Sequence, residues 1–376
     1  MRVRPAGPTG PGHDAEHDLA LTSARGVTGR ALLLTPSRGI GGGIERYVET
    51  LEWAFTAQGV EYQRIDLIRP GPAAHARMLS RAHAQLRAER APTRLVVAHR
   101  ALLPVASLLA RERPVSGISV MCYGTDVWCG TRLRPRWWVE RYLMRRPGVR
   151  VVAISSFTAG VLAHGSPATI LVPGLSREWF HTLVEASAVA REREPGLNLL
   201  TAFRLGDWRD KGLPQLLDAV AALGRSDIRV TVCGSGQPPA DLQQLVLERP
   251  YCALRPGLTD RELACELAAA DLFVLATRTR PGRNASGEGF GLVLLEAQVA
   301  GTPVVGPAYG GSHDAFIDGV TGVAPANETT AALTMLLGDL LRDPKRLARM
   351  GRSAAELSRE CFAPDSYASR VVARLL

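Results

Sequence analysis

The sequence predicts an α/β protein of two doubly wound domains that face each other across a cleft. With 376 residues, the chain is longer than one hydrophobic core usually supports. Apolar strand-like runs alternate with helical segments along most of its length. The alternation lapses at residues 185–196, "EASAVAREREPG", which is polar and ends in Pro-Gly, so we place an interdomain linker there.

The N-terminal half begins with a strand and a helix that a glycine closes, and four further strand-like runs follow. Repeated strand-helix units of this kind form mainly parallel sheets covered on both faces. We assign residues 29–184 to a first domain. Residues 1–28 are rich in Gly and Pro and lack the apolar centre of a signal peptide, so we expect a disordered lead. The expected elements are a strand at 30–36, a helix at 44–59, and strands at 60–68, 93–99, 115–124 and 149–155.

The alternation restarts after the linker and defines a second domain over residues 197–360. Residues 361–376 read as a helix that could pack on either domain, and we expect the first. Open parallel sheets bind ligands at the carboxyl ends of their strands, so the cleft is the expected site. The expected strands are 197–203, 228–234, 251–257, 271–277 and 302–308, and the helices between them are 212–223, 240–248, 261–270 and 291–301.

Composition narrows the class of protein. No apolar run is long enough to span a bilayer, and the six cysteines form no CxxC pair, which argues against zinc and disulfides and favours a reducing cytoplasm. The net charge of +9 favours anionic partners such as phosphates, nucleic acid or acidic lipid.

A glycine-rich loop, "TPSRGIGGGIERY", joins the first strand to the first helix. The dinucleotide fingerprint G-x-G-x-x-G could begin at Gly39, but its last position falls on Ile44, which weakens an NAD interpretation without removing it. Glycines before a helix N-terminus let an anion approach the backbone amides, so we expect a phosphate near this loop. A connection without a ligand is the alternative.

Two carboxylates lie in "GEGFGLVLLEAQVAG", residues 287–301. Glu288 sits in a glycine-flanked turn, and Glu296 lies in an apolar helix where a carboxylate needs hydrogen-bond partners. Eight residues of helix span at most about 12 Å, which exceeds the separation of a glycosidase pair and suits the two ends of a sugar nucleotide. An exposed turn residue and a structural ion pair are the alternative.

Arg204 and Lys211 follow a strand in "FRLGDWRDKG" and could neutralise a diphosphate leaving group. No Asp-x-Asp occurs to hold Mg²⁺, so these cations could replace a metal. Two solvated surface charges are the alternative.

Taken together, these stretches resemble the retaining glycosyltransferases of family 4, the glycosyl transferases group 1, whose GT-B fold has two Rossmann-like domains. The resemblance covers nearly the whole chain from about residue 30 and rests on the order of the motifs. The most specific motif is E-x7-E, present as Glu288 and Glu296. The others are "GGGIERY", "YGTDVW", "VVAISSFTAGVL", "LVPGLSREWF", "FRLGDWRDKGLPQLLDA", "VCGSGQ" and "PGLTDRELACELAAADLFVLATR".

The resemblance implies a metal-independent hexosyltransferase that needs no cofactor and retains anomeric configuration by front-side attack. Arg204 and Lys211 would bind the donor diphosphate, Glu296 the ribose, and Glu288 the transferred sugar. The further residues implied at the nucleotide sugar are the backbone of Phe290, Gly291 and Leu292 beside the sugar and phosphate, Gly42 or Gly43 at the diphosphate, and Gly257 and Leu258 at the nucleobase.

The acceptor should enter near His99, Tyr123 and Asp126. Many relatives have His where this chain has Tyr123, so the resemblance does not carry over the identity of the donor sugar. A structural role is the alternative for His99.

Residues 132–150 combine seven arginines with two tryptophans and a tyrosine. Arg141 and Arg145 share one helical row and Trp138 and Tyr142 another, as on a helix lying against anionic lipid. Aromatic residues packed in the core are the alternative. No nucleic-acid recognition motif accompanies the charge.

The sequence therefore predicts a bacterial, cytoplasmic glycosyltransferase, peripheral on the inner face of the membrane if this helix binds lipid. It would transfer a hexose from a UDP- or GDP-sugar to a small-molecule or lipid-linked acceptor, in cell-envelope or natural-product biosynthesis. A sugar-nucleotide binding protein without turnover and an NAD-dependent oxidoreductase are the alternatives.

Overall fold

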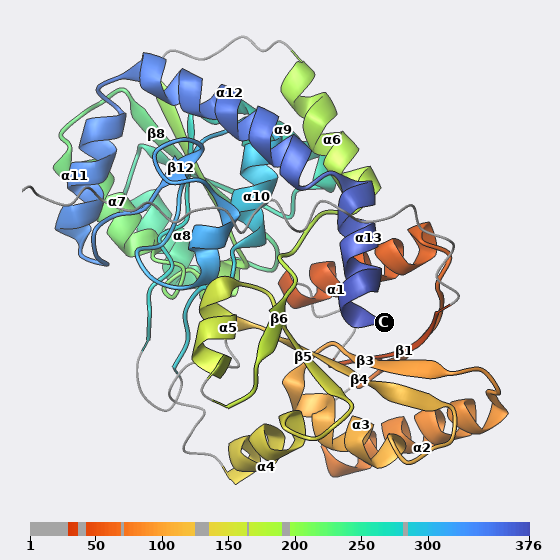
Figure 1. Cartoon of the computed structure of the whole chain (residues 1–376). Coiled ribbons are helices and arrows are strands. Elements are labelled where there is room, and N and C mark those ends of the chain that lie inside the picture. Colours follow the sequence, from red (N-terminus) through yellow and green to blue (C-terminus); the bar gives the residue numbers. More distant parts are fainter. Residues whose placement is uncertain are drawn as a thin grey trace, which may run out of the picture.

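The computed structural model describes residues 29–36, 43–68, 71–124, 135–163, 165–189, 196–280 and 285–376. Within them the chain forms two α/β lobes, each built on a six-stranded sheet whose neighbouring strands are parallel. Figure 1 shows the two lobes side by side, with the later part of the chain forming most of one of them. The predicted lead at 1–28 and residues 190–195 of the predicted linker lie outside the described residues.

The first sheet has the strand order β2-β1-β3-β4-β5-β6. The strand order reverses between β1 and β3, so the loops that follow these two parallel strands diverge at the carboxyl edge of the sheet. The strands are β1 (Arg30–Thr35), β2 (Glu61–Asp66), β3 (Thr93–Val97), β4 (Val115–Cys122), β5 (Val149–Ala153) and β6 (Ala168–Ile170).

Helices cover both faces of this sheet. Tyr47, Leu51 and Phe55 recur every four residues along α1 and are buried, which is why that segment folds as a helix against the strands. The helical elements are α1 (Gly43–Ala57), α2 (Pro72–Ala88), the 3-10 turn η1 (Arg100–Leu102), α3 (Leu103–Leu109), α4 (Pro135–Met144) and α5 (Ser156–Ala163).

The second sheet has the order β12-β11-β10-β7-β8-β9, with its switch point between β7 and β10. Its strands are β7 (Leu197–Ala202), β8 (Ile228–Gly234), β9 (Cys252–Pro256), β10 (Leu272–Val274), β11 (Val304–Val305) and β12 (Gly322–Val323). Its helical elements are η4 (Leu205–Asp207), α7 (Leu213–Ala222), α8 (Ala240–Leu247), α9 (Asp260–Ala269), α10 (Leu292–Val299), η5 (Gly311–Ala315) and α11 (Thr330–Leu340).

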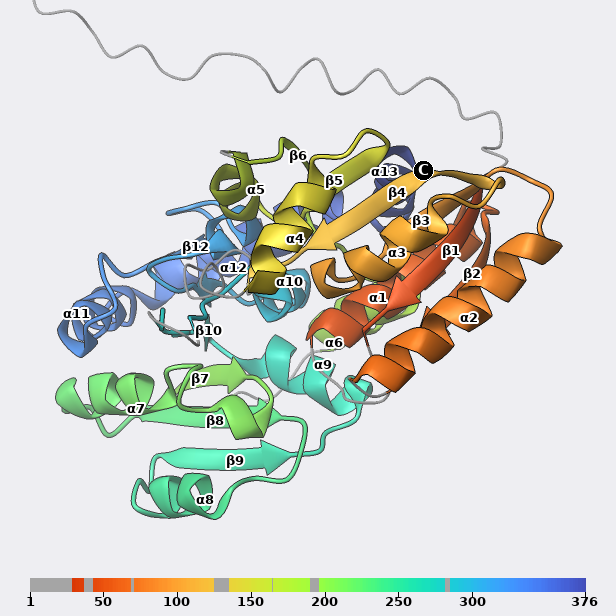
Figure 2. The ribbon, with the colours of Figure 1, turned by 90° about the horizontal axis from the view of Figure 1, so that it is seen from below.

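Three helices connect the lobes. α6 (Arg177–Ala188) packs against α9 and α10, so residues 177–184, which the sequence places in the first domain, lie on the second. Their apolar side chains Trp179, Phe180 and Leu183 are buried there. Figure 2 shows α6 and α9 between the second sheet and α1.

The last two helices cross back to the first lobe. α12 (Pro344–Cys361) packs on α10, and α13 (Pro364–Leu375) packs on α1. The Ser119 hydroxyl donates to the Leu375 carbonyl at 2.7 Å, and Arg150 donates to the Arg374 carbonyl at 3.0 Å. The C-terminal helix is therefore fixed to the first sheet.

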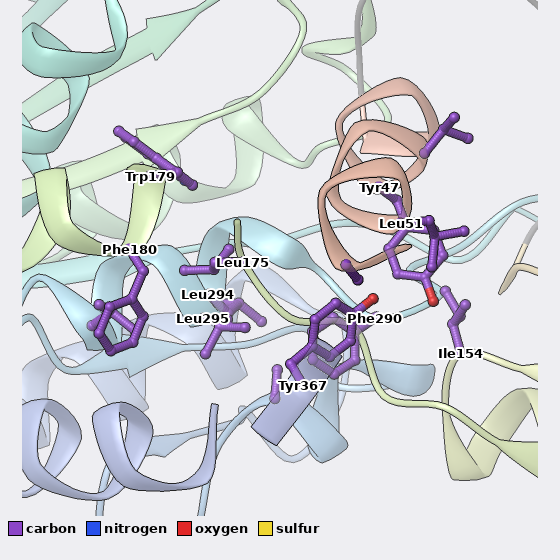
Figure 3. Packing of buried hydrophobic residues seen from close by; sticks show 14 of the residues in the cluster. Tyr47, Leu51, Ile154, Leu175, Trp179, Phe180, Phe290, Leu294, Leu295 and Tyr367 are labelled. Atoms are coloured by element: carbon purple, nitrogen blue, oxygen red, sulfur yellow. The ribbon is translucent and has the colours of Figure 1, made fainter. Parts of the chain in front are cut away.

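One buried apolar cluster includes residues of both lobes. Tyr47 of α1, Phe290 before α10 and Tyr367 of α13 lie close together in it (Figure 3). A Cβ on Gly174 would lie 2.4 Å from the ring of Tyr367, so the chain entering α6 passes directly over this ring. The packing fixes the lobes against each other.

Candidate functional site

The candidate site lies where the loops after β7 and β10 and the start of α10 approach the first lobe. Lys211 lies in the loop after β7, and Thr277 and Glu288 both lie in the connection between β10 and α10. Lys211 Nζ and the Thr277 hydroxyl each donate a 2.9 Å hydrogen bond to Oε2 of Glu288. The structure thus brings together two of the predicted residues, Lys211 and Glu288, and adds Thr277.

The pKa of Glu288 is below its ordinary value. Burial alone would raise this pKa, but the charge of Lys211 and the hydrogen bonds from Lys211, Thr277 and the Gly289 amide outweigh burial. Glu288 is therefore ionised at neutral pH and can only accept hydrogen bonds.

The backbone around Glu288 is also held. The Glu288 carbonyl accepts a 2.9 Å hydrogen bond from the Gly311 amide, and Glu288 forms a bridge with Gly310. A Cβ on Gly310 would lie 2.4 Å from the Glu288 carbonyl oxygen. Position 310, just before η5, therefore requires glycine where it contacts the loop that carries Glu288.

The predicted diphosphate cations occupy the loop after β7. Arg204 precedes η4 and is exposed, and Lys211 keeps 27% of its side chain accessible while it binds Glu288. Both stand at the carboxyl edge of the second sheet, as the sequence predicts.

The start of α10 carries the predicted backbone contacts. Gly291 precedes the helix with φ of 81°, a conformation that favours glycine, and Leu292 is the first helical residue. Phe290 is buried in the cluster between the lobes, so it anchors this turn with its side chain and leaves only its backbone for a ligand. Backbone amides at a helix N-terminus are groups that can bind an anion, and the first amides of α10 are of this kind.

Glu296 lies one to two turns further along α10 with 4% of its side chain exposed. Arg46 Nη1 donates to its Oε1 at 2.9 Å, and Trp179 Nε1 donates to the same oxygen at 3.1 Å. The partners that a carboxylate needs in this apolar helix therefore come from α1 and α6. Arg46 also donates to Asp260 of α9 at 2.7 Å.

Gly257 and Leu258 follow β9. Gly257 adopts a φ of 68°, and Leu258 is half-buried against the cluster between the lobes. Thr259 then caps α9 by accepting from the Glu262 amide. The predicted nucleobase loop therefore stands next to Asp260, the second partner of Arg46.

The first lobe places His99 and Tyr123 together. Their ring centroids lie 6.2 Å apart, and Tyr123 packs edge-on against Tyr47 at 5.8 Å. Nδ1 of His99 accepts from the Ala101 amide at 3.1 Å, so this nitrogen caps η1. Tyr123 is buried. Gly43 begins α1, while Gly42 and Asp126 lie outside the described residues.

The lobes touch at the site through two glycines that the sequence did not single out. A Cβ on Gly124 would lie 2.3 Å from the Cα of Gly289. Nearby, Asp314 accepts from the backbone amide of Ser156 at the start of α5, and the Ser156 hydroxyl donates to Asp314 at 2.6 Å. The loop that carries Glu288 is thus in direct contact with the first lobe.

A cavity of about 290 Å³ lies at the other end of the first sheet, lined by the start of β1, β2 and β3 and by α2. It is remote in the fold from Glu288 and at the amino ends of the strands, which is the wrong edge for a ligand site in this architecture.

Among the described residues no helix is long and apolar enough to cross a bilayer, and no cluster of three or more His, Cys, Asp or Glu could hold a metal ion.

Known proteins share this sequence pattern. The family model "Glycosyl transferases group 1" matches residues 194–357. The GDP-mannose-dependent alpha-(1-6)-phosphatidylinositol monomannoside mannosyltransferase of Mycolicibacterium smegmatis is 32% identical over 269 residues, which cover 67% of this chain and 68% of that protein. The D-inositol 3-phosphate glycosyltransferase of Streptomyces avermitilis is 39% identical over 213 residues, 46% of this chain and 44% of that protein.

Solved structures share the fold. Sucrose-phosphate synthase from Thermosynechococcus elongatus superposes with a TM-score of 0.74 at 17% identity, over 92% of this chain and 98% of that one. Anabaena Alr3699/HepE in complex with UDP and glucose gives 0.68 at 16% identity, over 91% and 98%. The chain therefore belongs to the glycosyl transferases group 1, glycosyltransferase family 4, and has the GT-B fold of two Rossmann-like domains that the sequence predicts.

Proposed function

We propose that this chain is a retaining hexosyltransferase that uses a GDP- or UDP-sugar and needs no metal or cofactor. The observation that carries the proposal is the convergence of Lys211 and Thr277 on Glu288, immediately before the N-terminus of α10. The carboxylate suits a sugar hydroxyl, and the cation and the amides of the helix N-terminus suit the negative charge of the phosphates.

The diphosphate would bind at the first turn of α10 and at the two cations after β7. Lys211 is hydrogen-bonded to Glu288 on one side and accessible on the other, so it can bind a phosphate oxygen without leaving the carboxylate. Arg204 is exposed on the same loop. Negative charge grows on the diphosphate as the sugar bond breaks, and fixed cations stabilise that charge more in the transition state than in the ground state.

Glu288 would orient the sugar. Its two oxygens have about four acceptor positions in total. Hydrogen bonds from Lys211, Thr277 and the Gly289 amide use three of them and leave capacity for a sugar hydroxyl. A carboxylate so committed is a poor nucleophile, which supports front-side attack. In that step the acceptor oxygen bonds to the anomeric carbon on the face that the phosphate leaves, and the acceptor proton passes to the departing phosphate oxygen.

We propose that α4 binds an anionic membrane surface, which would present the acceptor to the enzyme. Trp138, Val139 and Tyr142 are 63%, 51% and 66% exposed, which argues against the interpretation that the aromatic residues of this helix pack in the core. Arg145 and Arg146 are exposed beside them. On the inner side of the helix, Glu140 forms a buried 2.9 Å ion pair with Arg100. This arrangement supports a peripheral enzyme on the inner membrane face, with a lipid-linked acceptor.

Cosedimentation with vesicles of phosphatidylglycerol and phosphatidylcholine tests the membrane proposal. The wild-type chain should pellet with anionic vesicles, and the double variant Trp138→Ser/Tyr142→Ser should stay in the supernatant. Leu247→Ser is the matched control, because Leu247 is 78% exposed on α8 of the other lobe. Equal recovery of wild type and double variant in the supernatant would refute membrane binding.

Product formation tests the enzymatic proposal. The chain is incubated with UDP- and GDP-hexoses and a lipid extract, in the presence of excess EDTA, and nucleoside diphosphate release is measured. We expect release that requires both one donor and the extract, and an NMR coupling constant that shows the donor's anomeric configuration in the product. A product with inverted configuration would refute the retaining mechanism, and dependence on added metal would refute metal independence. Tighter binding of NAD than of UDP or GDP would refute the assignment as a glycosyltransferase.

A further inference from the structure

Arg46 connects three elements around the far end of the donor site. It lies in the first turn of α1, on the first lobe, and its two terminal nitrogens bind two carboxylates of the second lobe. Nη1 donates to Glu296 at 2.9 Å and Nη2 donates to Asp260 at 2.7 Å. The guanidinium carbon lies 5.0 Å from the ring centroid of Trp179 on α6.

These partners bind one of the two carboxylate oxygens of Glu296. Among the described residues, the donors to Glu296 are Arg46 and Trp179, and both bind Oε1. The side chain is otherwise enclosed, with 4% of it exposed. The carboxylate is therefore fixed in one rotamer, and Oε2 is the oxygen left to accept hydrogen bonds from a ligand.

The second partner of Arg46, Asp260, lies beside the loop at which we propose the nucleobase to bind. Asp260 begins α9, directly after the Gly257-Leu258 loop at the carboxyl end of β9. A nucleoside placed with its ribose at Glu296 and its base at this loop would lie alongside the Arg46 side chain. Because 35% of that side chain is exposed, it forms part of the surface there.

We propose that Arg46 is a positioning residue for the donor ribose: it holds Glu296 Oε1 so that Oε2 faces the ribose hydroxyls. This inference rests on the proposed function. It also gives the first lobe a direct part in nucleotide recognition, since α1 supplies the cation.

The chemistry favours arginine for this task. A planar guanidinium can bind two carboxylates at once and stack on an indole, whereas an ammonium is a point charge that would serve one carboxylate. The pKa of Arg46 is raised chiefly by the charge of Glu296, so the guanidinium remains a cation at any pH of interest.

Calorimetric titration tests the proposal with wild type, Arg46→Ala and Arg46→Lys. Each is titrated with the preferred nucleoside diphosphate, UDP or GDP, and with its 2′-deoxy and 3′-deoxy forms. The wild type should bind the ribonucleotide about tenfold more tightly than at least one deoxy form, as expected for loss of a hydrogen bond to a charged group. Arg46→Ala should bind the ribonucleotide about tenfold more weakly and lose most of this preference, and Arg46→Lys should be intermediate.

Arg225→Ala is the matched control, because Arg225 also forms a two-point ion pair with a carboxylate, Asp227, but far from the site. This variant should keep the full preference for the ribonucleotide. If Arg46→Ala fails to fold, Arg46→Lys still decides, because undiminished preference for the ribonucleotide in that variant would contradict the need for the guanidinium.

The remaining outcomes separate the inference from the function on which it rests. Tighter ribonucleotide binding by Arg46→Ala would show that Arg46 competes with the ribose, and equal weakening of ribo- and deoxynucleotides would show a general structural role. Either result overturns the inference and leaves the proposed function standing. A wild-type chain that binds neither UDP nor GDP overturns both.

Discussion

Gly124 of the first lobe and Gly289 of the second lie backbone against backbone, so that a Cβ on Gly124 would come within 2.3 Å of the Gly289 Cα. Gly289 follows Glu288 directly, and Gly124 follows the buried Tyr123. The position of the Glu288 loop therefore depends on how closely the lobes approach. The geometry of the loop that carries Glu288 therefore depends on both lobes.

Gly124→Ala should lower kcat by at least about tenfold while the protein stays folded, because the added methyl group must push the Glu288 loop or the whole lobe away. Steady-state kinetics and small-angle scattering would measure the loss and any opening of the lobes. Gly160→Ala is the control, since a Cβ on Gly160 of α5 meets nothing within 4 Å. Unchanged kcat in Gly124→Ala would show that this contact does not matter.

Thr277→Val removes one donor from Glu288 and keeps the shape of the side chain. With Lys211 still bound, we expect kcat/KM to fall by about tenfold, the usual effect of one hydrogen bond to a charged group. Lys211→Met should cost orders of magnitude more, because it also removes the cation proposed at the diphosphate. Equal losses in the two variants, measured with saturating acceptor, would contradict this ranking.

The lowered pKa of Glu288 makes its contribution to stability depend on pH. The unfolded chain binds a proton at Glu288 at about pH 4.3, and the folded chain does so only at lower pH. The contribution is therefore complete above the unfolded pKa and is lost as pH falls through the folded pKa. Urea unfolding of wild type and Glu288→Gln should show a stability difference that is largest near neutral pH and shrinks in acid. A difference that grows in acid would mean that the carboxyl is protonated in the native state.

Asp314 and Ser156 should contribute both to stability and to the contact between the lobes. Asp314→Ala removes the side chain that accepts from the first amide of α5, and loss of such a cap costs about 1 kcal/mol. Because the cap joins the two lobes, scattering should also show a larger radius of gyration. Ser369→Ala is a suitable control, since its hydroxyl donates to the Asp365 carbonyl within α13. A loss of stability without a larger radius of gyration would show that Asp314 caps α5 but does not hold the lobes together.

The strands and most helices could be predicted because their signals are local. Runs such as residues 30–36 and 228–234 are apolar and bounded by turns, and they form β1 and β8. Helix α6 was not predicted from the sequence. It is polar on one side, and its last residues, 185–188, look like the start of a linker. The buried positions Trp179 and Leu183 show its true pattern only once α9 and α10 are in place.

The site could be predicted only in part, for the same reason. Glu296 in an apolar helix signalled that a partner must exist, but the partner, Arg46, is 250 positions away in the sequence. Its place three residues after Gly43 puts it in the first turn of α1, and nothing in the sequence shows which carboxylate that turn faces. Gly124 looked like any turn glycine, since close approach of two backbones leaves no pattern in either segment.

A crystal structure with the nucleoside diphosphate that binds most tightly would show whether the nucleotide occupies the site around Lys211, Glu288 and Glu296. We expect the diphosphate at the first turn of α10, with Lys211 Nζ within hydrogen-bond distance of a phosphate oxygen and the ribose hydroxyls on Glu296. A nucleotide held elsewhere, for example in the cavity lined by Arg30, Tyr62 and Gln85 at the amino edge of the first sheet, would contradict it.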